Sequence, residues 1–325
     1  INTNVFASQK LTRRVALGLL FGFGVLLVLV LAGDLRQVSE RVWTFRWGLY
    51  PLVIALTLFN YTLRFFKWHF YLRLIGVREL PLIESARLFV AGFPLSVTPG
   101  KVGEALKAVW LNQAVGVAVG RGVAVVLAER ISDGLAVLSL SALGVIAYPR
   151  YWPAFASGLV LLLGIIVISQ VRPLALAILG IGERLPVVRR FAHTLHEFYE
   201  GSFVLFRPKA TLVAVGLGII SWLGEGIGFY VILVGLGIAP GWETLSVAVF
   251  ILSFSTVIGA LSTLPGGLGA AEVSIAGMLV LLLGLDTGLS ATATLLIRFA
   301  TLWFGVGLGL AVWVFSKELL GFGNG

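Results

Sequence analysis

Cysteine is absent from this chain of 325 residues, and charged side chains are scarce. Without cysteine there is no disulfide, no thiolate nucleophile and no cysteine-ligated metal. Only 12% of the residues are Asp, Glu, Lys or Arg, whereas a soluble domain carries about 25%. Hydrophobic residues make up 58% of the chain and the mean hydropathy is +1.01. Such a composition cannot cover a water-facing surface, so it predicts an integral membrane protein.

The net charge of +9 does not point to nucleic acid. The Lys and Arg residues lie beside apolar runs, as expected for loops at an anionic lipid surface. We therefore predict membrane lipids and no nucleic acid as partners. The sequence shows no catalytic motif, metal-ligand pattern or cofactor signature, so we predict no catalytic residue, no metal site and no cofactor.

Six apolar runs are long enough to cross a bilayer, for which roughly 20 residues suffice. They are residues 15–33, 47–67, 122–148, 152–171, 211–236 and 289–315. The first run follows three basic residues, as a signal peptide would. It is longer than a signal h-region and lacks a convincing cleavage site, so we expect an anchor that is retained.

Two further pairs of apolar segments are each split by Pro-Gly. Residues 87–95 and 102–119 flank Pro99 and Gly100, and residues 245–264 and 268–285 flank a second break, formed by Pro265, Gly266 and Gly267. Proline removes a backbone donor and glycine favours a turn. Each pair is therefore predicted to form a re-entrant helical hairpin. The fold class is all-α and polytopic, with about six spans and two hairpins.

The two breaks carry matching charges. Glu104 follows the first break and Arg130 lies 26 residues further on, and Glu272 and Arg298 repeat that spacing after the second break. Broken helices and intramembrane charges at corresponding positions of two halves indicate a transport site. Because the equal spacing would reproduce the same contact, we predict that each glutamate pairs with its arginine.

The repeat and the Lys/Arg bias define the predicted organisation. One transmembrane domain covers residues 1–325, with a first half at 47–171, a polar connector at 172–209 and a second half at 210–317. The bias places the N-terminus, the connector and the C-terminus in the cytoplasm. The hairpins would then enter from opposite faces, and the two halves would be inverted.

Seven residues form the predicted substrate-binding set: Lys101, Glu104, Arg130, Asp133, Glu225, Glu272 and Arg298. For the hairpin glutamates, the alternative is a carboxylate that complements a helix N-terminus. For Arg130, it is an ion pair with Asp133 one turn along the helix. Arg298 has no acidic neighbour within a turn, so we expect it rather than Arg130 to contact a phosphate, for which arginine offers bidentate geometry.

Glu225 lies in the middle of an apolar run between Gly224 and Gly226. Such a carboxylate is protonated, paired with a base or exposed to a water-filled groove. Arg64 and Lys67, near the end of the second span, are expected to extend to the cytoplasmic interface, with Arg64 as a possible partner for Glu225.

The hairpin segments carry a family resemblance. The stretches Ala91-Gly92, Thr98-Pro99-Gly100-Lys101-Val102-Gly103-Glu104 and Leu264-Pro265-Gly266-Gly267-Leu268-Gly269, with Glu272, resemble the flippase-like family named after the transmembrane region of lysylphosphatidylglycerol synthase, over about residues 11–317. The resemblance implies a multi-pass protein of the bacterial or archaeal cytoplasmic (inner) membrane that moves a lipid between leaflets. Proposed lipids in the family are aminoacylated phospholipids, polyprenyl-linked sugars and hopanoids, and a lipid-modifying enzyme is a possible partner. The resemblance is to the transmembrane region alone and not to the aminoacyltransferase domain of the synthase, so we do not expect lipid synthesis.

Two other classes of function remain as alternatives. A membrane-embedded transferase would need a nucleophile or a metal-binding acidic cluster, which the sequence does not show. A non-transporting scaffold would leave the repeated charges unexplained. We therefore expect a lipid transporter that is not an enzyme, with a polar groove at the bilayer midplane.

Overall fold

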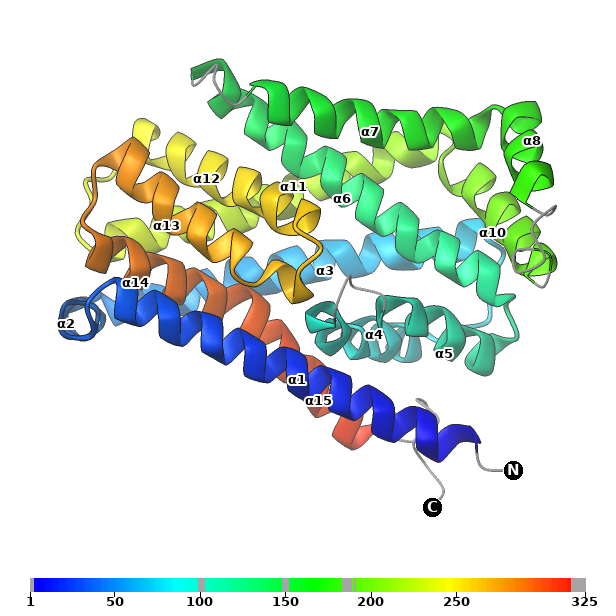
Figure 1. Cartoon of the computed structure of the whole chain (residues 1–325), viewed down its shortest axis with the longest axis horizontal. Helices are drawn as coiled ribbons and strands as arrows, with labels where there is room; N and C mark the ends of the chain where they lie inside the picture. Colours follow the sequence, from blue (N-terminus) through cyan, green and yellow to red (C-terminus); the bar gives the residue numbers. More distant parts are fainter. Residues whose placement is uncertain (1–2, 99–102, 148–151, 183–188, 190, 317–325) are drawn as a thin grey trace.

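The computed structural model describes residues 3–98, 103–147, 152–182, 189 and 191–316 (Figure 1). These residues are helical and contain no strand, as the composition predicts. The elements in chain order are α1 (Thr3–Ala32), α2 (Leu35–Thr44), η1 (Trp47–Leu49), α3 (Tyr50–Leu74), α4 (Leu82–Ala91), η2 (Phe93–Val97), α5 (Leu106–Val115), α6 (Val119–Ala147), α7 (Trp152–Gln170), α8 (Arg172–Gly182), α10 (Ala192–Leu205), α11 (Pro208–Gly235), α12 (Trp242–Leu261), η5 (Pro265–Gly267), α13 (Ala270–Leu283), α14 (Thr287–Arg298), η6 (Phe299–Trp303) and α15 (Phe304–Phe315).

Six segments of the described chain are long and apolar enough to cross a membrane: Arg13–Ala32, Trp47–Leu74, Pro208–Gly235, Trp242–Leu261, Pro265–Leu283 and Thr287–Phe315. Four of them correspond to predicted spans. The other two are the arms of the second predicted hairpin, and each arm has the length of a full span. Helices α6 and α7, also predicted to span, contain 29 and 19 residues, and α6 carries four charged side chains.

Helix α11 is the centre of the bundle and packs against α3, α6 and α12. Its glycines allow this close approach. A methyl group on Gly224 would lie 3.1 Å from Phe59 of α3, and one on Gly226 would lie 2.8 Å from Val249 of α12. Small residues at helix contacts let backbones approach closely in membranes. The residue between these two glycines, Glu225, is therefore held where three helices meet.

The two broken segments meet in the interior of the molecule. In Figure 1, α4 and α5 approach from the end that holds both termini, whereas α12 and α13 approach from the opposite end. Their tips, η2 and η5, are in contact, and a methyl group on Gly266 would lie 3.6 Å from the Val97 side chain. Helix α1 crosses both tips, because Gly18 lies against the backbone of Val97 and Gly22 lies against Leu268.

The turn chemistry of the tips follows the sequence. Gly266 and Gly267 have φ angles of 61° and 68°, which glycine adopts without a steric penalty. At the first tip the Thr98 hydroxyl donates to the Leu95 carbonyl at 2.6 Å and accepts from the Gly103 N–H at 3.0 Å, so one side chain links both arms. The predicted breaking residues Pro99 and Gly100 lie outside the described residues.

Different helices lie at the two ends of the molecule. The termini, α8 and α10 lie at one end, and α2 and the start of α12 lie at the other (Figure 1). The predicted connector corresponds to α8 and α10, and α10 packs on α6. If the Lys/Arg bias sets the orientation, the end with α10 faces the cytoplasm.

We predict this orientation to be visible by cysteine labelling. Because the chain has no cysteine, a single introduced cysteine is the only thiol that a maleimide can label. Glu243→Cys, on the exposed start of α12, should react with an impermeant maleimide in intact cells, and His193→Cys, exposed on α10, should react only after permeabilisation. Leu281→Cys, on the apolar surface of α13, is the control and should not react because a thiolate needs water. Labelling of both polar positions from one side would contradict the orientation.

Candidate functional site

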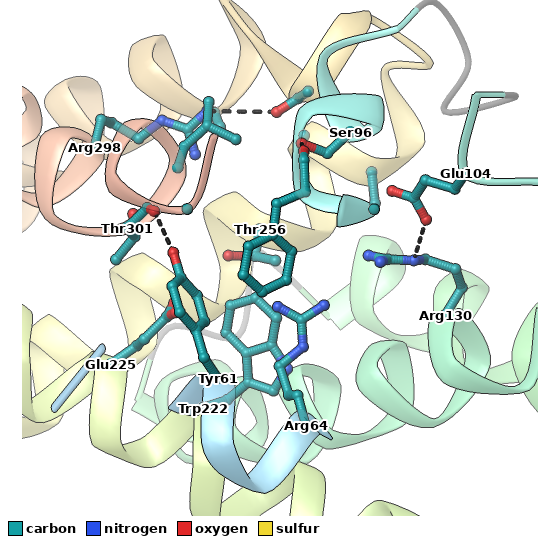
Figure 2. A pocket seen from close by; sticks show the side chains of 18 of the residues that line it. Tyr61, Arg64, Ser96, Glu104, Arg130, Trp222, Glu225, Thr256, Arg298 and Thr301 are labelled. Carbon is teal, nitrogen blue, oxygen red and sulfur yellow. Dashed lines mark hydrogen bonds and ion pairs between the residues drawn. The ribbon is translucent and has the colours of Figure 1, made fainter. Parts of the chain in front are cut away.

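A pocket of about 160 Å³ lies beneath the meeting hairpin tips. It is bounded by both hairpins and by α3, α6, α11 and the α14–η6 junction (Figure 2). Its charged lining residues are Arg64, Glu104, Lys107, Arg130, Glu225 and Arg298, and its aromatic lining residues are Tyr61, Phe89, Phe93 and Trp222. A charged cavity in a bundle of apolar helices is the default candidate for a functional site.

The glutamate and arginine that lie 26 residues apart form an ion pair after each of the two breaks. Arg130 Nε lies 2.8 Å from Glu104 Oε2, and Arg298 Nε lies 2.5 Å from Glu272 Oε1. Each pair joins the second arm of a hairpin to the following long helix. The predicted pairing is therefore confirmed for both glutamates.

Glu272 has both of its oxygens in use. Its Oε2 accepts from the Gly269 N–H at 2.7 Å, which caps α13, while Oε1 binds Arg298. Arg298 also donates from Nη2 to the Gly266 carbonyl at 3.4 Å. The capping alternative thus holds for this glutamate, together with the ion pair. Glu272 stands behind the pocket wall and does not line it.

The first pair is more open than the second. The Arg130 side chain is 35% exposed, against 13% for Arg298, and Glu104 Oε1 has no hydrogen-bond partner among the described residues. Arg130 therefore keeps more of its guanidinium free for a ligand than Arg298 does. This order of availability is the reverse of the one that the sequence favours.

Asp133 pairs with helix α3 and not with Arg130. Its Oδ1 accepts from Lys67 Nζ at 2.5 Å and from Trp222 Nε1 at 3.2 Å, and its Oδ2 lies 3.5 Å from Arg64 Nε. The expectation that Arg64 and Lys67 reach the interface is wrong, because the two side chains are 12% and 1% exposed. Helix α3 turns them towards α6 and α11, where Asp133 supplies the counter-charge. Asp133 itself does not line the pocket.

The ion pair of Lys107 with Glu129 was also not predicted. Lys107 Nζ lies 2.7 Å from Glu129 Oε2, and the ammonium stands 4.1 Å from the ring centre of Trp68, a cation–π distance. Lys107 follows Glu104 by three residues and Glu129 precedes Arg130. The signal was therefore available in the sequence as two charges within one helical turn on each of the two predicted helices.

Glu225 is buried, with 5% exposure, and lines the pocket. Within the part of the chain that the structure describes, its carboxylate forms no ion pair and no hydrogen bond. Tyr61, beside it in Figure 2, instead donates its hydroxyl to the Thr301 carbonyl at 2.5 Å. That carbonyl belongs to the π-helical turn η6 that follows Arg298, and such turns are frequent at functional sites.

The pocket brings together four of the seven predicted site residues, namely Glu104, Arg130, Glu225 and Arg298. Asp133 and Glu272 lie behind its wall as counter-ions, and Lys101 lies outside the described residues. Sequence reasoning missed Lys107, Trp222 and Tyr61, and it misplaced Arg64. A helical projection of α3 would have found the polar face on which Asn60, Arg64, Lys67 and Tyr71 recur at intervals of three and four residues.

Comparison with known proteins shows the family to which the chain belongs. Residues 15–309 match the family described as the lysylphosphatidylglycerol synthase TM region. A UPF0104 membrane protein of Methanothermobacter thermautotrophicus is 26% identical over 313 residues, covering 89% of this chain and 90% of the relative. A second match to a protein of that name from the same organism is 31% identical over 127 residues, covering 38% of this chain and 36% of the relative. No solved structure matches.

We predict that Glu272→Gln lowers the free energy of unfolding by about 3–5 kcal/mol, the usual cost of breaking a buried ion pair. Glutamine still accepts a hydrogen bond from Gly269, so the substitution isolates the charge. Glu104→Gln should cost less, because Arg130 is partly hydrated. Unfolding in detergent measures both, with the exposed Glu40→Gln as the control. Equal stability of Glu272→Gln and Glu40→Gln would show that the Arg298 pair is not structural.

Proposed function

As a member of the family of the lysylphosphatidylglycerol synthase transmembrane region, the chain is a multi-pass membrane protein, and we propose that it moves a polar-headgroup lipid between the two leaflets. The observation that carries the proposal is the charged pocket beneath two broken segments that meet from opposite ends of the molecule. Phospholipid, aminoacyl-lipid, polyprenyl-phosphate-linked and hopanoid headgroups are the candidate cargoes. The activity involves no covalent chemistry.

A lipid headgroup cannot cross hydrocarbon unaided, because moving an isolated charge out of water costs many kcal/mol. The pocket offers a polar environment part-way along that path. Its guanidinium groups donate to a phosphate, and its aromatic rings bind the apolar parts of a headgroup. The acyl chains stay outside, against apolar faces such as that of α13, where Val273 and Leu281 are exposed.

The ion pairs orient the two arginine side chains before a ligand binds. Glu104 and Glu272 approach Arg130 and Arg298 through Nε, which orients each guanidinium while leaving further N–H donors. Arginine held in this way binds phosphate with less loss of side-chain freedom than lysine. We propose Arg130, the more exposed of the two, as a phosphate contact and Arg298 chiefly as the residue that fixes the second hairpin.

The inverted relation of the two halves belongs to the same proposal. Hairpins that enter from opposite faces expose their shared pocket to one side at a time when one half rocks against the other. The Lys/Arg bias predicts that both termini lie in the cytoplasm, and it supports the proposal that the protein resides in the cytoplasmic membrane.

We expect Arg130→Lys to lower lipid translocation per folded molecule roughly tenfold, because lysine keeps the charge but loses bidentate geometry. The measurement is movement of acyl-labelled phospholipids in proteoliposomes, with melting temperature in detergent as the test of folding. Arg36→Lys, on a side chain that is 88% exposed, is the matched control. Translocation by Arg130→Lys at the unaltered rate would remove Arg130 from the site, and an unaltered protein that moves no lipid would refute the proposed function.

A further inference from the structure

The charges around the pocket balance, and two of them lack a close ion-pair partner among the described residues. Among the described residues, five acids and five bases meet around the pocket: Glu104, Glu129, Asp133, Glu225 and Glu272, with Arg64, Lys67, Lys107, Arg130 and Arg298. Four acids each have one base within 2.8 Å. The remaining two charges are Arg64 and Glu225, and both line the pocket.

Arg64 is held by one long ion pair and by a cation–π contact, with its guanidinium carbon 5.6 Å from the ring centre of Trp222. Arg64 Nε lies 3.5 Å from Asp133 Oδ2, and neither atom has a hydrogen-bond partner among the described residues. Lys67 already binds the other oxygen of Asp133 at 2.5 Å. Arg64 can therefore turn to a ligand without leaving Asp133 as a bare buried charge, which would be costly.

Glu225 is the complementary group. It is a buried carboxylate that lines the cavity, and no cation among the described residues forms an ion pair with it. In Figure 2, Glu225 and Arg64 lie on opposite sides of the Tyr61 and Trp222 side chains. A carboxylate beside aromatic rings is an environment that recognises an ammonium group, because the ring faces attract cations.

Resting on the proposed function, we infer that this pocket selects a zwitterionic headgroup, with its phosphate bound by Arg64 together with Arg130, the phosphate contact proposed above, and its ammonium bound by Glu225. The five acids and five bases sum to zero, so a ligand of zero net charge leaves the buried cluster neutral. An anionic headgroup without an ammonium would satisfy Arg64 but leave Glu225 unpaired beside added negative charge. The cargo class is therefore a phosphodiester linked to an amine, as in a phosphoethanolamine or phosphocholine lipid.

Binding tests this inference without requiring transport. Isothermal titration of the full chain in detergent compares dihexanoyl phosphatidylethanolamine with dihexanoyl phosphatidylglycerol. We expect the ethanolamine lipid to bind at least tenfold more tightly, since hydrogen bonds to charged groups contribute about that factor or more. Glu225→Gln should abolish the preference, Arg64→Gln should weaken both lipids, and Glu243→Gln, on an exposed acid of α12, should change neither.

Equal binding of the two lipids, or binding of neither, would overturn the inference. So would a Glu225→Gln protein that keeps the preference, which would favour a role for Glu225 in binding a proton. If Glu225→Gln does not fold, the Arg64→Gln variant is the test. Unaltered affinity for both lipids in that variant would show that Arg64 does not bind the phosphate and would overturn the inference. A transport assay in proteoliposomes separates the two proposals. If the protein binds the ethanolamine lipid selectively but translocates neither lipid, the transport function is refuted and the zwitterion-binding site is retained.

Discussion

The arrangement of this protein depends on the pairing of charges inside an apolar bundle. An arginine at the centre of a membrane helix costs about 2.5–3.5 kcal/mol on insertion scales, and an unpaired buried ion costs more. Within the described ranges, each of the five bases around the pocket contacts an acid on another segment. The pairs therefore act as positional constraints: Glu104 with Arg130 and Glu272 with Arg298 fix each hairpin arm to the helix that follows it.

Small residues and helix breaks make these contacts possible. Gly224 and Gly226 bring α3 and α12 close to α11 and leave Glu225 at the junction. A methyl group on Gly267 would lie 2.9 Å from the backbone of Gly259, so the turn of η5 fits only glycine. The π-helical turn after Arg298 presents the Thr301 carbonyl to Tyr61. The pocket is thus a consequence of interrupted helices whose polar groups are satisfied by side chains from neighbouring helices.

The sequence alone predicted the helical membrane class, four of the spans and the two symmetric ion pairs, because each rests on composition or on spacing along the chain. It did not predict the partners of Asp133, since Lys67 is 66 positions away and meets it only when α3 packs on α6. The rule that basic residues near span ends reach the interface fails for Arg64 and Lys67, whose carboxylate partner lies on another helix. For Glu272, sequence reasoning offered capping or pairing as alternatives, whereas the structure uses one oxygen for each. Whether the halves are inverted stays a prediction.

The central proposal is that the two hairpins, whose tips meet above the pocket, move against each other during transport, so the contact between the tips must break. The chain has no cysteine, and a side chain at Gly266 would touch Val97, so Val97→Cys with Gly266→Cys should form a disulfide across η2 and η5. The measurement is lipid translocation by this double variant in proteoliposomes before oxidation, after oxidation and after reduction, with each single variant as a control. We predict that oxidation stops translocation and that reduction restores it. Translocation at an unchanged rate by the fully oxidised protein would contradict the account.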